Sequence, residues 1–126
     1  MAPTLAIVER SHRGTVEQQY AHVLWLVHGL HRQSPMTLLL RGGAAVYALD
    51  APPAGPVRVG GVPWGSFPDY HDALRRLRVD GAGVWVSGSS LARLGMVDFP
   101  LLPGIGAVTD QEIVKMMIDC DRIWYL

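Results

Sequence analysis

The stretch that decides the fold is GVWVSGSSLARLGM, residues 83–96. Its apolar run, Val84 to Val86, ends in small polar residues, and a helical pattern begins at Leu91. This order is typical of a buried strand that leads into a helix at the carboxyl edge of an open sheet. The stretch therefore predicts an α/β fold, with serines at the edge where ligands of such sheets bind.

Apolar runs and helical patterns alternate along the rest of the chain. A strand that is followed by a helix and another strand usually forms a right-handed parallel unit. One doubly wound α/β domain over residues 1–126, without an internal repeat, is therefore predicted. An extended piece is also expected at 57–59, inside the proline- and glycine-rich residues 51–66. Strands are expected at residues 5–8, 37–40, 83–86, near 108 and at 122–126, and helices at 16–33, 44–49, 66–78, 91–95 and 110–118.

The charge of the chain is balanced, since eleven Lys and Arg accompany eleven Asp and Glu. Balanced charge gives no general attraction for nucleic acid or an anionic membrane. No apolar run is long enough to span a bilayer, and the residues before Glu9 are too few for a signal peptide. The single cysteine, Cys120, excludes an internal disulfide and fits a reducing compartment. We expect a soluble cytoplasmic protein with no nucleic-acid or membrane partner.

Charged residues are also sparse. They make up 17% of the chain, compared with about 25% in typical soluble proteins. Trp25 and Leu26 lie off the apolar stripe of the expected helix 16–33 and add to the apolar surface. Burial of both sheet faces, or contact with other subunits, would account for this composition, and we expect both.

Three polar segments are expected to meet at the carboxyl edge of the sheet. They are the loop that holds Arg10 and Arg13, the turn at Gly42 and Gly43, and residues 87–90. Two of them lead into helix N-termini, which favour anions. A pocket for a small anion is one interpretation, and ordinary strand-to-helix loops are the other. The glycine-rich phosphate loops are missing from the sequence.

Two further chemistries depend on histidine. A nucleophilic serine at 87, 89 or 90 would need a base such as His12 or His71, but the sequence lacks the Gly-x-Ser-x-Gly elbow. His28 and His31 have the spacing of metal ligands, although no third ligand is nearby in the sequence. An amphipathic helix with two partly buried imidazoles explains this pair better. No metal and no cofactor are expected.

Cys120 lies between Asp119 and Asp121. Two flanking carboxylates are expected to raise the pKa of the thiol and disfavour the reactive thiolate. A packed thiol is one interpretation of Cys120, and a reactive one is the alternative.

The order of these features resembles the DsrE/DsrF-like family of sulfur-relay proteins, which includes TusB, TusC, TusD and YchN-like proteins. The likeness runs nearly end to end. It covers the opening strand and long helix, the segment Leu38-Leu39-Leu40-Arg41-Gly42-Gly43, residues 83–96, and the tail from Ile118 to Leu126. Active members carry a cysteine after the apolar run, then small residues, then Arg-x-Gly. Here Ser87 follows the run, then Gly88-Ser89-Ser90, then Arg93-Leu94-Gly95.

The resemblance implies a flavodoxin-like sheet of about five mainly parallel strands, with helices on both faces, in proteins that assemble as trimers or hexamers. In active members the strand-end cysteine passes a persulfide between carrier proteins, and its position falls on Ser87. A hydroxyl neither ionises near neutral pH nor forms an S–S bond, so Ser87 cannot carry sulfane sulfur.

We therefore predict a non-catalytic subunit or binding protein of intracellular sulfur trafficking. It would assemble with itself or with DsrE/TusD-like paralogues that bear the cysteine, alongside sulfur-carrier proteins. Two alternatives stay open, namely a sulfurtransferase that uses Cys120 and a sensor of small anions. The candidate binding residues are Ser87, Gly88, Ser89, Ser90, Arg93, Arg10, Arg13, Gly42 and Gly43.

Overall fold

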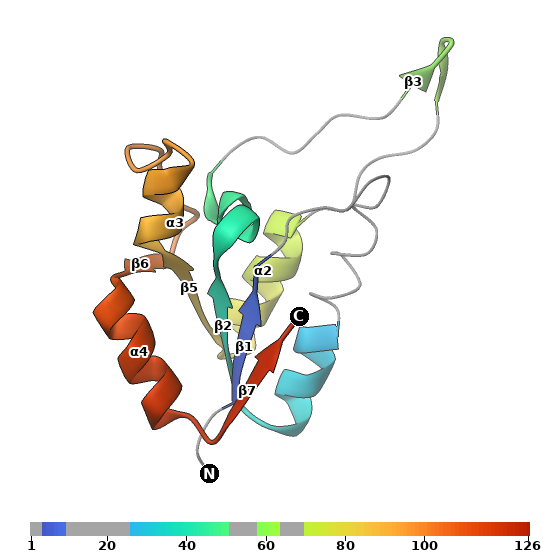
Figure 1. Ribbon diagram of the computed structural model, residues 1–126. Helices are drawn as coiled ribbons and strands as arrows, with labels where there is room; N and C mark the ends of the chain where they lie inside the picture. Colours follow the sequence, from blue (N-terminus) through green and yellow to red (C-terminus); the bar gives the residue numbers. More distant parts are fainter. Residues whose placement is uncertain (1–3, 10–25, 51–57, 64–69) are drawn as a thin grey trace.

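The fold is built on one parallel sheet of five strands in the order β6-β5-β2-β1-β7 (Figure 1). The computed structural model describes residues 4–9, 26–50, 58–63 and 70–126. The predicted α/β class, with a doubly wound parallel sheet of five strands, is confirmed. The strands of the sheet are β1 (Thr4–Val8), β2 (Met36–Leu40), β5 (Gly83–Ser87), β6 (Gly106–Val108) and β7 (Arg122–Tyr125).

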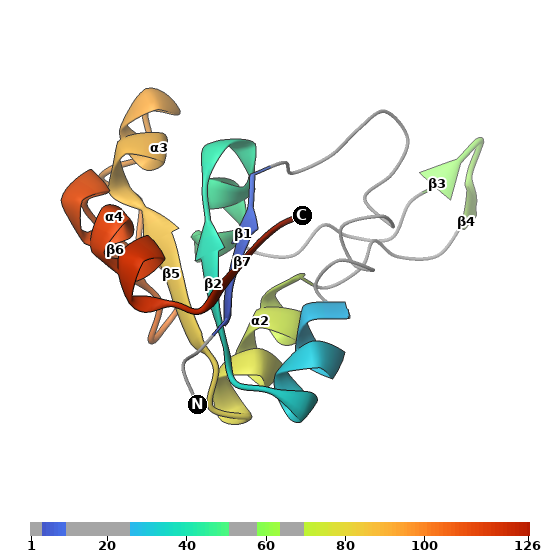
Figure 2. The ribbon, with the colours of Figure 1, turned by 60° about the horizontal axis from the view of Figure 1, so that its bottom comes forward.

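Helices cover both faces of this sheet (Figure 2). The chain moves in one direction from β1 through β2 and β5 to β6, and then returns past β1 to form β7. Because parallel crossovers are right-handed, this reversal places the last helix on the opposite face from the earlier ones. The helical elements are residues 26–33, the 3₁₀-helix η1 (Gly42–Ala48), α2 (Tyr70–Val79), α3 (Gly88–Arg93) and α4 (Asp110–Asp119).

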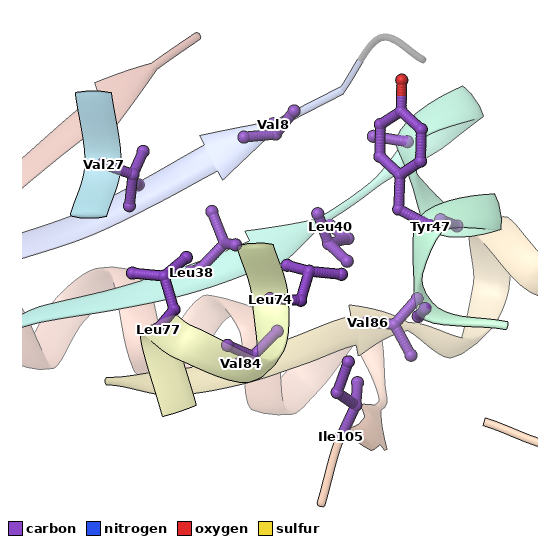
Figure 3. Packing of buried hydrophobic residues seen from close by; sticks show 14 of the residues in the cluster. Val8, Val27, Leu38, Leu40, Tyr47, Leu74, Leu77, Val84, Val86 and Ile105 are labelled. Atoms are coloured by element: carbon purple, nitrogen blue, oxygen red, sulfur yellow. The ribbon is translucent and has the colours of Figure 1, made fainter. Parts of the chain in front are cut away.

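The larger core lies between the sheet and the helices that precede α4 (Figure 3). Alternate strand residues point to it, among them Leu38, Leu40, Val84 and Val86. Leu74 and Leu77 lie on the inner face of α2, where both side chains are fully buried. The remaining strand residues, such as Leu5, Ile7 and Leu39, form a smaller core with Ile113 of α4. Within the part of the chain that the structure describes, only α4 packs over this second face.

Several boundaries differ from those expected. The helix of the opening stretch begins at Gly88 rather than near residue 91, because Ser87 caps it. The extended piece at 57–59 is one arm of a hairpin, β3 (Arg58–Val59) and β4 (Val62–Pro63). Gly60 and Gly61 form its turn with φ values of 59° and 80°, which suit glycine.

Residues 10–25, which hold Trp25 and most of the first expected helix, lie outside the described residues, as do 64–69. None of the described helices is both long and apolar enough to cross a lipid bilayer.

Candidate functional site

Ser87 closes strand β5 and begins helix α3. Its side chain is 1% exposed, and its Oγ accepts a hydrogen bond from the Ser90 backbone N–H at 3.2 Å. This is the geometry of an N-cap, in which a side-chain oxygen satisfies one of the free amides of the first helical turn. The Ser87 hydroxyl is therefore part of the fold at the end of β5.

Ser89 connects this cap to the opposite face of the sheet. Its Oγ lies 3.1 Å from the Ser87 Oγ and donates to Asp110 Oδ1 at 2.8 Å. Asp110 is the first residue of α4, which Thr109 caps through a capping box with Glu112. From the sequence, Asp110 is expected only at the start of the helix 110–118. Its contact with Ser89, 21 residues earlier, has no signal in the sequence.

Ser90 joins the same edge to strand β2. The Ser90 Oγ accepts a hydrogen bond from the Gly42 backbone N–H at 2.9 Å. Gly42 has a φ of +53°, and a Cβ at this position would lie 2.8 Å from the Glu9 carbonyl oxygen. Only glycine fits such a close approach in this conformation. The carboxyl ends of β1, β2 and β5 are thereby held together.

The structure brings Ser87, Gly88, Ser89, Ser90 and Gly42 to one edge, as the sequence expected. The other candidates are placed differently. Gly43 is half-buried within η1, and Arg93 is exposed in the last turn of α3. Arg10, Arg13 and His12 lie outside the described residues.

The hydrogen bonds at this edge limit its chemistry. Ser89 donates to a carboxylate, and the Gly42 amide is already bonded to Ser90, so neither is free to hold an anion. Among the described residues, no histidine is hydrogen-bonded to the three serines. A serine needs a base to become a nucleophile. The described residues of this edge form a hydrogen-bond network that joins β5, α3, α4 and the turn after β2.

His28 and His31 gather at the opposite edge, around Asp80. His28 bonds the Asp80 carboxylate, while His31 Nε2 lies 2.8 Å from the Asp80 carbonyl oxygen and its Nδ1 accepts the Met36 N–H at 3.0 Å. The hydrogen bond from His28 holds the pKa of Asp80 below its usual range. In the described ranges, no group of three His, Cys, Asp or Glu side chains is placed to hold a metal ion. The two imidazoles tie the helix at 26–33 to the start of β2 and to the turn after α2.

Cys120 is also remote from the serines. It follows the last residue of α4, whereas Asp110 begins that helix, so the ten residues of α4 separate the two positions by about 15 Å along its axis. The half-buried thiol donates to the Met117 carbonyl oxygen at 3.2 Å. It lines a cavity between α4 and the amino-terminal half of the sheet.

By sequence, the chain matches neither a protein-family model nor a curated protein. Among solved structures it is similar to the ychN protein from E. coli, with a TM-score of 0.75 over 98% of this chain and 99% of that one. The chain has the fold of the ychN protein. A protein of unknown function from Methanobacterium thermoautotrophicum, MTH1491, is also similar, with a TM-score of 0.61 over 98% and 96% of the two chains. The identities are 17% and 16%, so the likeness is one of fold.

Proposed function

We propose that the chain is a non-catalytic DsrE/DsrF-like subunit of cytoplasmic sulfur trafficking. The observation that carries the proposal is the state of Ser87, the residue at the position of the relatives' cysteine. Its oxygen is buried and bonded to the first turn of α3. The ychN-like fold of the whole chain supports the same assignment. The lone thiol, Cys120, suits a reducing compartment.

The chemistry of the strand end agrees with this role. A persulfide carrier needs a thiolate that a donor can reach, and Ser87 offers a hydroxyl that is 1% exposed. Around it, Ser89 and Asp110 complete a closed set of hydrogen bonds. In our proposal this network keeps the relatives' active loop in shape, so that the subunit supports a cysteine-bearing partner or a sulfur-carrier protein without loading sulfur itself.

Assembly with itself, as a trimer or hexamer, is the second part of the proposal. Strand β7 lies at the edge of the sheet, and its apolar side chains Ile123, Trp124 and Tyr125 are all exposed. The Leu126 amide bonds to Ile7 of β1, and amide direction alternates along a strand, so the amides of Ile123 and Tyr125 point away from the sheet. An apolar edge with free backbone groups favours association with another chain.

Light scattering coupled to size-exclusion chromatography tests the assembly. At micromolar concentration we expect the mass of three or six chains. Ile123→Lys, which puts a charge on the β7 edge, should lower that mass toward one chain. Val97→Lys, at an exposed apolar position in the loop after α3, is the matched control and should leave the mass unchanged. A wild-type mass of one chain would contradict self-assembly.

A second candidate function is a sulfurtransferase that uses Cys120, which the position of this thiol on a cavity wall favours. Mass spectrometry after incubation with a persulfide-bearing donor protein separates the two functions. Our proposal predicts no added sulfur on the wild-type chain. An adduct of one sulfur that Cys120→Ala abolishes would establish the second candidate instead.

A further inference from the structure

The cavity beside α4 has the size of a ligand site and plays no part in the proposed sulfur function. Its volume is about 410 Å³, within the range of about 300–1,000 Å³ that is usual for small-molecule pockets. Strands β1, β2, β5 and β6 form its floor, and one side of α4 forms its wall. The serine network lies at the other end of α4, so the cavity is a separate feature.

The floor of the cavity carries the indole of Trp85. Two of the positions beside it on the same face of the sheet are glycines, namely Gly83 on the same strand and Gly106 directly opposite on β6. A Cβ on Gly106 would lie 2.8 Å from the indole Cζ3, and one on Gly83 would lie 3.2 Å from its Nε1. The two ends of the indole therefore occupy the space that side chains at positions 83 and 106 would fill. The indole thus lies against the backbone at Gly83 and Gly106 and lines the cavity.

Trp85 is 39% exposed, although the residues on either side of it in β5 are buried. Within the described ranges its indole N–H has no hydrogen-bond partner. An aromatic side chain of this size normally contributes most to stability when it is buried. The two glycines therefore hold open a flat aromatic surface at the bottom of a cavity.

The wall contributes charge. Glu112, Lys115 and Asp119 recur at steps of three and four residues, so they share one side of α4 and line the cavity. The Glu112 carboxylate is held in the capping box with Thr109. Lys115 and Asp119 form no ion pair with each other or with any other residue that the structure describes. Two carboxylates and one ammonium give the lining a formal charge of −1, and the face of an indole is also electronegative.

We propose that this cavity binds a small flat aromatic cation, which stacks on Trp85 and pairs with Asp119. A planar aromatic ring can stack on the indole, and a positive charge is attracted both by the indole face and by the negative lining. The Lys115 ammonium opposes the cation, so the site is selective for a single positive charge rather than several.

Isothermal titration calorimetry with 1-methylquinolinium tests the proposal, with quinoline as the neutral ring at pH 7.5. We expect one site per chain and an affinity for the cation about fivefold higher than for quinoline, as an exposed cation–π contact would give. Trp85→Leu should weaken binding of the cation by about tenfold or more. Asp119→Asn should weaken it and Lys115→Gln should strengthen it. Phe99→Leu is the control, since Phe99 is 52% exposed in the loop after α3 and does not line the cavity.

Alkylation of Cys120 gives a second readout, because it is the sole cysteine and lines the same cavity. At a concentration that just saturates the wild type, 1-methylquinolinium should slow the reaction of Cys120 with iodoacetamide in the wild type and in Phe99→Leu, and much less in Trp85→Leu. Asp119 is exposed, so Asp119→Asn keeps the test informative if Trp85→Leu does not fold. The proposal is wrong if neither ring binds at millimolar concentration, or if Trp85→Leu and Asp119→Asn both bind like wild type. Protection of Cys120 by raised protein concentration alone would assign the cavity to a second copy of the chain.

Discussion

Replacing Ser87 by alanine should destabilise the protein by about 1.5 kcal/mol, within a range of about 1–3 kcal/mol. The substitution removes the acceptor of the Ser90 amide, and Ser90 is itself buried. Loss of an N-cap costs about 1 kcal/mol, and a buried amide without a partner adds to that cost. Ser89 also loses its contact with Ser87 but keeps its bond to Asp110, so this loss contributes little.

Urea unfolding, followed by circular dichroism, measures this change. With a slope of about 1.5 kcal/mol per molar urea, the midpoint should fall by about 1 M while the slope stays constant. Ser89→Ala is the control, because this side chain is only half-buried and its loss should cost about 0.5 kcal/mol. A Ser87→Ala midpoint equal to that of the wild type would refute the reasoning, since the hydroxyl would then not act as a cap.

Three further predictions concern the core, the indole and pH. Leu77→Ala, at a fully buried position of α2, should cost about 2–5 kcal/mol in urea unfolding. Gly106→Ala should displace the Trp85 ring, because a Cβ there would clash with the indole, and a shift of the indole N–H signal in NMR spectra would report the displacement. An unchanged signal would contradict the close contact between the indole and Gly106. Because the hydrogen bond from His28 lowers the pKa of Asp80, that carboxylate stabilises the fold above the ordinary carboxyl range, and this contribution is lost as the pH falls through the lowered value. The stability difference between wild type and Asp80→Asn should therefore be present at pH 7 and vanish in strong acid, and a difference that grows in acid would contradict it.

The parallel sheet could be predicted because its strands carry uninterrupted apolar runs. Leu38, Leu39 and Leu40 alternate between the two faces of the sheet, so both faces must be buried. Leu38 and Leu40 lie in the larger core and Leu39 in the smaller one. The order of the strands could not be read in the same way. β7 lies next to β1 although the whole chain separates them, and no local pattern specifies that pairing. The hairpin of β3 and β4 was missed because its Gly60-Gly61 turn lies among many other glycines and prolines.

The site was predictable in position but not in role. The serines after β5 were expected at the carboxyl edge, and they lie there. Their partners come from distant parts of the chain: Gly42 lies 48 residues before Ser90, and Asp110 lies 21 residues after Ser89. Such contacts follow from the crossovers of the fold rather than from local spacing. The position of the Trp85 indole against the backbone likewise depends on a glycine in a neighbouring strand, Gly106.

Labile sulfur on the purified wild-type chain tests the central claim most directly. The protein would be exposed to a persulfide-bearing donor, separated from it, and treated with cyanide, and the thiocyanate released would be counted per chain. Our account predicts none, because it proposes that Ser87, which has no thiol, stands at the position of the relatives' cysteine. Release of about one sulfur per chain would contradict it and make this protein a carrier.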